Sequence, residues 1–137
     1  MAAGTYNFVI EQGSTIDFTI QYKDAAGLPV DLTDYEARMD MRPAAGSDTL
    51  YVNVNSEVID ADGTGINKTP PSPDNVGDLP ASSGSLRVFI SAASSSTLTF
   101  DRARYDLEIY SGSAPDIIVS KILTGVVKLR QEVTTSN

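Results

Sequence analysis

Apolar and polar residues alternate with a period of two along several stretches of this chain. The clearest run covers residues 15–23, and its apolar positions are Ile16, Phe18, Ile20 and Tyr22. Residues 35–42 repeat the pattern, and their apolar positions are Tyr35, Ala37, Met39 and Met41. Because successive side chains of a β-strand point to opposite faces, both runs predict strands with one buried and one solvated face. A helix would mix the two sets of residues on one face.

Shorter apolar runs predict further strands in the rest of the chain. They lie at residues 6–10, 50–54, 86–90 and 105–109. Two more stretches, 117–119 and 123–129, predict a last strand or a strand pair. Turns rich in Gly, Pro, Asp and Ser separate these runs. Seven or eight short strands joined by turns indicate an all-β, antiparallel sandwich that forms one domain over residues 1–137.

Two segments interrupt this pattern. Residues 91–97 are rich in Ser and Ala and predict one helical turn, which the core candidates Leu98 and Phe100 follow. Residues 56–84 are rich in Pro and Gly and show no periodicity. Roughly 25 residues without periodicity are long for a loop inside a compact domain. Two interpretations stay open for them: a solvent-exposed insertion, or an arm that orders against a neighbouring subunit.

The segment around Tyr105 matches a tyrosine corner. Asp101, Ala103 and Tyr105 have the Asp-x-Ala-x-Tyr spacing that opens strand F of immunoglobulin-like sandwiches. In those domains a disulfide cysteine follows two residues after the tyrosine, and here Leu107 takes its place. We therefore predict a cysteine-free immunoglobulin-like sandwich with the Tyr105 hydroxyl bonded back across the corner.

Composition narrows the range of functions. The net charge of −8 over 137 residues argues against binding to a phosphate backbone. The chain has no Cys and no His, which removes thiolate metal sites, thiol nucleophiles and the commonest general base. No apolar run is long enough to cross a bilayer, and residues 1–4 lack the features of a signal peptide. We expect a protein made in the cytoplasm, with no cofactor and with neither nucleic acid nor membrane as partner.

The acidic residues offer few candidates for chemistry. Residues 60–65 resemble the start of a calcium loop, but Pro71 stands where an EF-hand has a glutamate, so a turn is the simpler interpretation. Asp106 and Glu108 share a strand face as a catalytic pair would. The polar face of residues 36–42 has the same pattern, which favours a solvated face for both. No serine-nucleophile or phosphate-loop motif is present, and we predict no catalytic or metal-binding residue.

Seven residues are better candidates for contact with a partner protein. They are Tyr51, Phe89, Tyr110, Pro70, Pro71, Arg102 and Arg104. The three aromatic residues fall opposite the apolar sets of their strands, where exposed rings mark interfaces; burial under residues 56–84 or between two sheets is the alternative. The two arginines suit an acidic partner, with ordinary surface charge as the alternative. The two prolines belong to the arm-like segment.

Three stretches of the sequence resemble a family of small β-sandwich proteins from tailed bacteriophages. They are residues 6–15, 27–39 and 98–108, the last followed by residues 123–127. The most specific element is the Asp-Leu-Thr-x-Tyr-x-Ala-Arg-Met run that begins at Asp31. The layout is similar to that of immunoglobulin-like virion proteins and, more loosely, to the N-terminal domain of upper baseplate proteins. The resemblance covers most of the chain except residues 56–84 and implies no catalytic residues.

This resemblance implies a non-enzymatic structural component of the virion, in the tail, baseplate or neck, after synthesis in the host cytoplasm. We expect docking through sheet edges, through residues 56–84, and through flexible termini at residues 1–4 and 134–137. The expected partners are other virion proteins and copies of the chain in a symmetric assembly. A capsid decoration or cement protein and a carbohydrate-binding or adhesion module are the alternatives. A hydrolase is disfavoured by the absence of His.

Overall fold

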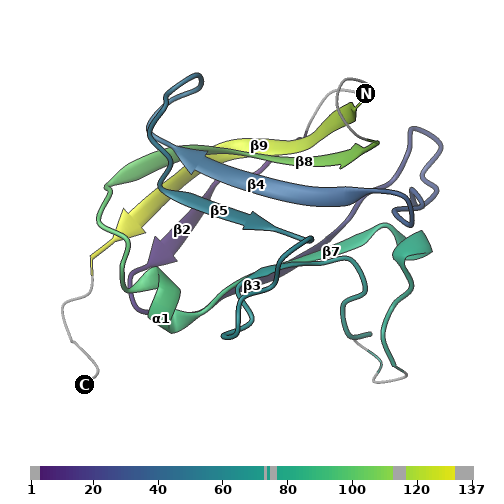
Figure 1. Ribbon diagram of the computed structural model, residues 1–137, viewed down its shortest axis with the longest axis horizontal. Helices are drawn as coiled ribbons and strands as arrows, with labels where there is room; N and C mark the ends of the chain where they lie inside the picture. Colours follow the sequence, from purple (N-terminus) through teal and green to yellow (C-terminus); the bar gives the residue numbers. More distant parts are fainter. Residues whose placement is uncertain (1–3, 73, 75–76, 113–116, 132–137) are drawn as a thin grey trace.

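Two β-sheets lie face to face and bury the apolar residues of both between them (Figure 1). The computed structural model describes residues 4–72, 74, 77–112 and 117–131. The large sheet contains β1 (Gly4–Thr5), β2 (Phe8–Glu11), β4 (Glu36–Arg42), β5 (Val52–Asn55), β8 (Arg102–Ser111) and β9 (Ile118–Arg130). The small sheet contains β3 (Ile16–Gln21), β6 (Gly65–Asn67) and β7 (Ser85–Ile90). A 3₁₀ turn, η1 (Ala81–Ser83), and a short helix, α1 (Ala92–Ser95), lie in the connections.

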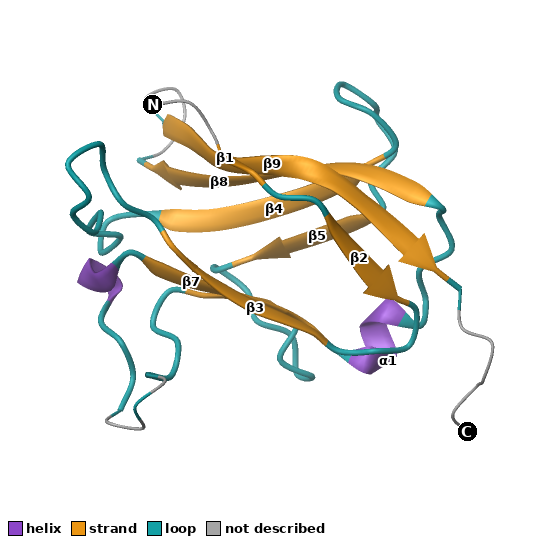
Figure 2. Ribbon diagram, turned by 180° about the vertical axis from the view of Figure 1, so that it is seen from behind, coloured by secondary structure: helices purple, strands orange, loops and turns teal. Residues whose placement is uncertain are grey.

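The strand order is that of an immunoglobulin-like sandwich. It is β3-β7-β6 in the small sheet and β9-β8-β4-β5 in the large sheet, with β1 and β2 both paired to the other edge of β9. These strands take the places of B, E and D and of G, F and C, with β5 added beside C as in variable-type domains. The prediction of an all-β immunoglobulin-like sandwich is confirmed. The strand pairs are antiparallel except at one edge, where β1 and β2 run parallel to β9 (Figure 2).

The strands predicted from the alternation are present in the structure. The two apolar stretches near the C-terminus, residues 117–119 and 123–129, lie along one strand, β9, which begins at Ile118. A β-bulge at Ile122 shifts the register of β9 opposite β8. The described residues contain nine strand segments instead of seven or eight. The two that were not predicted are β1 and β6, which have only 2 and 3 residues and are too short to show an alternation.

The inner faces of both sheets supply one core. Its fully buried members include Ile10, Leu32, Met39, Met41, Ile66, Leu86, Val88, Leu107 and Val127. Leu98 and Phe100 join this core, as predicted. The predicted helical turn is α1, and the Ser91 hydroxyl caps it by accepting a hydrogen bond of 3.0 Å from the Ser94 backbone N–H.

Tyr105 makes a long-range contact instead of a local corner. Its ring is buried between the sheets, and its hydroxyl donates to the backbone carbonyl of Tyr6, on the segment between β1 and β2. Burial raises the pKa of the Tyr105 phenol, so the hydroxyl stays protonated. The predicted bond back across the corner is therefore wrong. The Asp101 side chain is exposed, and its backbone carbonyl, not its carboxylate, accepts a bond of 2.9 Å from Leu129 N–H.

The same region explains why Gly125 is a glycine. A Cβ atom at this position would lie 2.0 Å from the Tyr6 carbonyl oxygen and 2.9 Å from the Tyr105 ring. The N-terminal segment can therefore approach β9 closely only because residue 125 has no side chain. Of the predicted flexible termini, only Gly4 is described, and it opens β1; the other positions lie outside the described residues.

Residues 56–84, predicted as an exposed insertion or an arm, contribute a strand to the sandwich, although much of the segment is exposed. They supply β6, which pairs with β7 and completes the small sheet. Ile66 and Pro70 are almost fully buried. The Lys68 ammonium group reaches back to the Tyr35 carbonyl oxygen and to the Glu36 carboxylate at 3.2 Å. The three residues of β6 carry no readable period, so their role depends on tertiary pairing.

Candidate functional site

The solvent-facing side of the large sheet carries most of the basic residues of the chain. On β2, β4, β8 and β9 this outer face holds the basic residues Arg38, Arg42, Arg102, Arg104, Lys121, Lys128 and Arg130. These are seven of the 10 Lys and Arg residues. Of the acidic residues that the structure describes, only five lie there, namely Glu11, Glu36, Asp40, Asp106 and Glu108. The outer face therefore has a net charge of +2 and the remainder of the chain −10, which together give −8.

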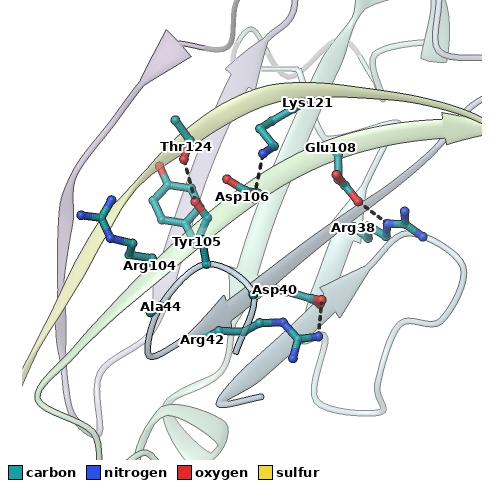
Figure 3. A pocket seen from close by; sticks show the side chains of 12 residues that line it. Arg38, Asp40, Arg42, Ala44, Arg104, Tyr105, Asp106, Glu108, Lys121 and Thr124 are labelled. Atoms are coloured by element: carbon teal, nitrogen blue, oxygen red, sulfur yellow. Dashed lines mark hydrogen bonds and ion pairs between the residues drawn. The ribbon is translucent and has the colours of Figure 1, made fainter. Parts of the chain in front are cut away.

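Figure 3 shows three ion pairs on the outer face, two between neighbouring strands and one within β4. Arg38 Nε lies 2.6 Å from the Glu108 carboxylate on the neighbouring strand. Arg42 lies 3.1 Å from Asp40 within β4, and Lys121 lies 3.1 Å from Asp106 across β8 and β9. These side chains are partly exposed, so each pair contributes at most about 1 kcal/mol to stability.

One end of the outer face carries four basic residues, of which only Arg42 is paired with a carboxylate of the described residues. The register places Arg104 directly opposite Arg42, and Arg102 directly opposite Lys128. Like charges that face each other across a sheet repel. Arg42 bonds to Asp40 and to the Ser47 carbonyl oxygen, but no hydrogen bond or ion pair joins the side chains of Arg102, Arg104 or Lys128 to another described residue. We name Arg42, Arg102, Arg104 and Lys128 the basic cluster.

A cavity of about 450 Å³ opens over the outer face next to this cluster. Charged residues of β4, β8 and β9 form its floor, and residues 44–46 of the loop after β4 form one wall. Figure 3 shows Arg104 beside Ala44, apart from the three ion pairs. Guanidinium groups bind carboxylates through two parallel hydrogen bonds, so this arrangement suits acidic side chains of a partner.

Arg102 and Arg104, which were predicted as a pair for an acidic partner, are thus exposed on one face. Tyr110 lies on the same face of β8, but it is already engaged. Its hydroxyl donates to the Glu57 carboxylate, and the Arg38 guanidinium lies 4.5 Å from the centre of its ring. Partial burial and the bond to Glu57 raise the pKa of Tyr110 to about 12.

The other two aromatic candidates are half-buried and lie elsewhere. Tyr51 stacks on Phe100 with ring centres 4.7 Å apart and planes 9° from parallel, so one face of its ring is covered. Phe89 belongs to the small sheet, where the Arg87 guanidinium lies 4.9 Å from its ring centre. A second cavity of about 310 Å³ adjoins Phe89 and is lined by Ile59 and Gly63 among others. The structure therefore does not bring the predicted aromatic residues together.

The two predicted prolines differ in accessibility. Pro70 is one of the most deeply buried residues, with less than 2% of its surface exposed, so its assignment to an interface is wrong. Pro71 is exposed and pairs with Asp78 through an isolated β-bridge. Burial of Pro70 follows from the packing of residues 56–84 against the core.

Residues 60–65 form a turn whose central carboxylate is a hydrogen-bond acceptor. Asp62 accepts bonds from the hydroxyls of Ser91 and Ser94 and from the Thr64 backbone N–H. These bonds, the one from Ser91 first, hold the pKa of Asp62 well below its usual range. The turn thus connects the start of β6 to the end of β7. Within the described ranges, no group of three or more acidic side chains is placed to hold a metal ion.

Sequence reasoning found two members of the basic cluster and missed the other two. Arg42 and Lys128 stand at polar positions of their strands and give no separate signal in the sequence. They join Arg102 and Arg104 only through the pairing of β4, β8 and β9.

None of the helices in the described part of the chain has the length and apolar character of a membrane span.

The fold and the outer face define an immunoglobulin-like β-sandwich with a charged sheet surface. No protein-family model and no curated protein sequence matches the chain. Among solved structures, it is similar to the N-terminal domain of phage TP901-1 ORF48, with a TM-score of 0.48 and 8% sequence identity. This match covers 93% of this chain and 84% of that chain. A similarity at this level carries no conclusion about function.

Proposed function

We propose that this chain is a non-enzymatic structural subunit of a tailed-phage virion and docks to its neighbours through the outer face of the large sheet. The observation that carries the docking is the basic cluster, in which Arg102, Arg104 and Lys128 form no ion pair with another described residue, on strands of an otherwise acidic chain. The virion as the setting rests on the resemblance of residues 6–15, 27–39 and 98–108 to immunoglobulin-like virion proteins.

The outer face has the properties that a specific protein contact needs. Its charged side chains project from paired strands, so little backbone order is lost when a partner binds. The ion pairs of Arg38 and Lys121 hold the centre of the face, while Arg102 and Arg104 are left available at one end. Complementary charge gives specificity and speeds association more than it adds affinity. A partner with carboxylates at the matching spacing is therefore favoured.

The edges of the two sheets supply a second means of docking. β5 is one edge strand of the large sheet, and β3 is one edge strand of the small sheet. Backbone N–H and C=O groups on the free side of an edge strand pair readily with a strand of a neighbour. Together, one charged face and two strand edges allow each subunit to contact more than one neighbour.

Tail, baseplate or neck is the proposed position in the virion. The carbohydrate-binding alternative is weakened because Tyr51 stacks on Phe100 and so offers only one ring face for a sugar. Immunogold labelling of intact and disrupted phage particles with an antibody to this chain tests the proposal. We expect label on the tail, baseplate or neck. Label over the head would instead support a capsid decoration protein, and particles without label would contradict both roles.

A further inference from the structure

We propose that the basic cluster binds the loop between β3 and β4 of a second copy of this chain, so that copies join head to tail. The inference rests on the proposed function, because it names the partner of the same outer face. The neighbour in the assembly is then another copy of the chain, and residues 24–34 of that copy form the acidic side of the contact.

Residues 24–34, which we name the acidic loop, have the complementary chemistry. The loop contains Asp24, Asp31 and Asp34, all exposed, and no Lys or Arg, although Lys23 precedes it. Asp24 accepts backbone bonds from Ala26 and Leu28, which fixes the shape of its turn. Leu28, between the carboxylates, has 62% of its surface exposed and supplies an apolar contact.

The Asp31 carboxylate of the acidic loop is stabilised in its ionised form. Asp31 accepts hydrogen bonds from both the hydroxyl and the backbone N–H of Thr33. These bonds lower the pKa of Asp31. One side of the contact thus offers fixed negative charge, and the other offers the unpaired guanidinium groups of Arg102 and Arg104.

The two surfaces lie at opposite ends of the molecule. The acidic loop leads into β4, and Arg42 is the last residue of that strand. Seven residues of extended chain span about 23 Å, so the surfaces are separated by the length of β4. In Figure 1 the loop lies beside η1, whereas β4 ends near the start of β8.

This separation determines the kind of assembly. Two different surfaces at opposite ends of a molecule meet in a heterologous contact, which continues from copy to copy. Such a contact closes into a ring when the rotation between copies allows it. The outer face has a net charge of +2 and the remainder of the chain −10. These opposite charges favour this contact over one between two identical ends.

Sedimentation velocity of the purified chain, with reversed charges at each end, tests the inference. One variant is Arg102→Glu with Arg104→Glu, the second is Asp31→Lys with Asp34→Lys, and the third combines all four changes. At about 0.01 M salt, where charges act over about 30 Å, we expect the wild type to associate. The first two variants should be monomeric, and the combined variant should associate again because its charges are complementary.

Controls separate this contact from effects of net charge and folding. Thr15→Glu with Thr19→Glu adds negative charge on the small sheet and should leave association unchanged. Asp31→Asn with Asp34→Asn, which keeps an acceptor for Thr33, should weaken association if the lysine variant does not fold. A wild-type chain that stays monomeric, or a combined variant that does not regain association, would overturn the inference. Either result together with gold label on particles would leave the proposed function standing.

Discussion

The two sheets share one core but differ in what holds their outer strands in place. In the large sheet, the N-terminal segment is fixed by close packing on Gly125 and by the bond from the Tyr105 hydroxyl to the Tyr6 carbonyl. In the small sheet, β6 is short, and its preceding turn is held by hydrogen bonds to the Asp62 carboxylate. Steric fit is insensitive to pH, whereas bonds to a carboxylate are lost on protonation. Acid should therefore loosen the small sheet first.

The largest effect is expected at the closest contact of the large sheet. Gly125→Ala places a Cβ atom 2.0 Å from the Tyr6 carbonyl oxygen, so β2 must move away from β9. We expect the free energy of unfolding to fall by about 3 kcal/mol in urea denaturation. Gly46→Ala is the matched control, because its Cβ meets open space and only the backbone strain of φ +80°, about 1 kcal/mol, remains. Equal losses for both variants would contradict the close packing.

A similar loss is expected in the small sheet if residues 56–84 belong to the core. Ile66 has 1% of its surface exposed, and Ile66→Ala should lower the free energy of unfolding by about 2 to 4 kcal/mol. In the same segment Val58 is 62% exposed, and Val58→Ala should change stability by less than about 0.5 kcal/mol. Thermal unfolding of the two variants measures the difference. If Ile66→Ala were as mild as Val58→Ala, the segment would be an insertion after all.

A smaller loss is expected from the hydroxyl of Tyr105. Tyr105→Phe removes the bond to the Tyr6 carbonyl and keeps the ring, so the free energy of unfolding should fall by about 1 kcal/mol. Tyr6→Phe serves as control, because the bond uses the backbone and not the hydroxyl of Tyr6. Urea denaturation at neutral pH measures the loss of stability in each of the two variants. A stable Tyr105→Phe chain would show that close packing alone holds the N-terminal segment.

The smallest effect is a difference in acid sensitivity. The pKa of Asp62 is lowered in the folded chain, so its contribution to stability is present above the ordinary value of 3.8 and is lost as the pH falls through the folded pKa. The wild type should therefore lose more stability than Asp62→Asn between about pH 4 and pH 2. Ser94→Ala, which removes one donor to the carboxylate, should also reduce the loss. Urea midpoints measured across this range test the prediction, and parallel curves for the three chains would contradict it.

Alternation predicted the parts of the fold that are local in sequence. The strands β3, β4 and β8 follow from their own residues, because each is long enough to show a buried and a solvated face. Contacts between distant segments left no such signal. The acceptor for Tyr105 lies 99 residues away, and β6 exists only because β7 pairs with it.

The candidate site shows the same division. Arg102 and Arg104 could be predicted as exposed, since they alternate with the buried residues of β8. Arg42 and Lys128 lie next to them only because of the register of three strands, β4, β8 and β9. This strand pairing determines the sign of the charge on a surface patch. The net charge of the chain, −8, does not reveal that its outer face is basic.

The most direct test of the account measures whether the basic cluster is needed for entry into particles. Infected cells would receive equal amounts of tagged wild-type chain and tagged Arg102→Glu, Arg104→Glu chain, and mass spectrometry would give their ratio in purified virions. We predict about tenfold depletion of the variant, which corresponds to about 1.4 kcal/mol of lost docking free energy. Thr15→Glu, Thr19→Glu should enter as well as the wild type. Equal incorporation of the arginine variant and the wild type would contradict the account.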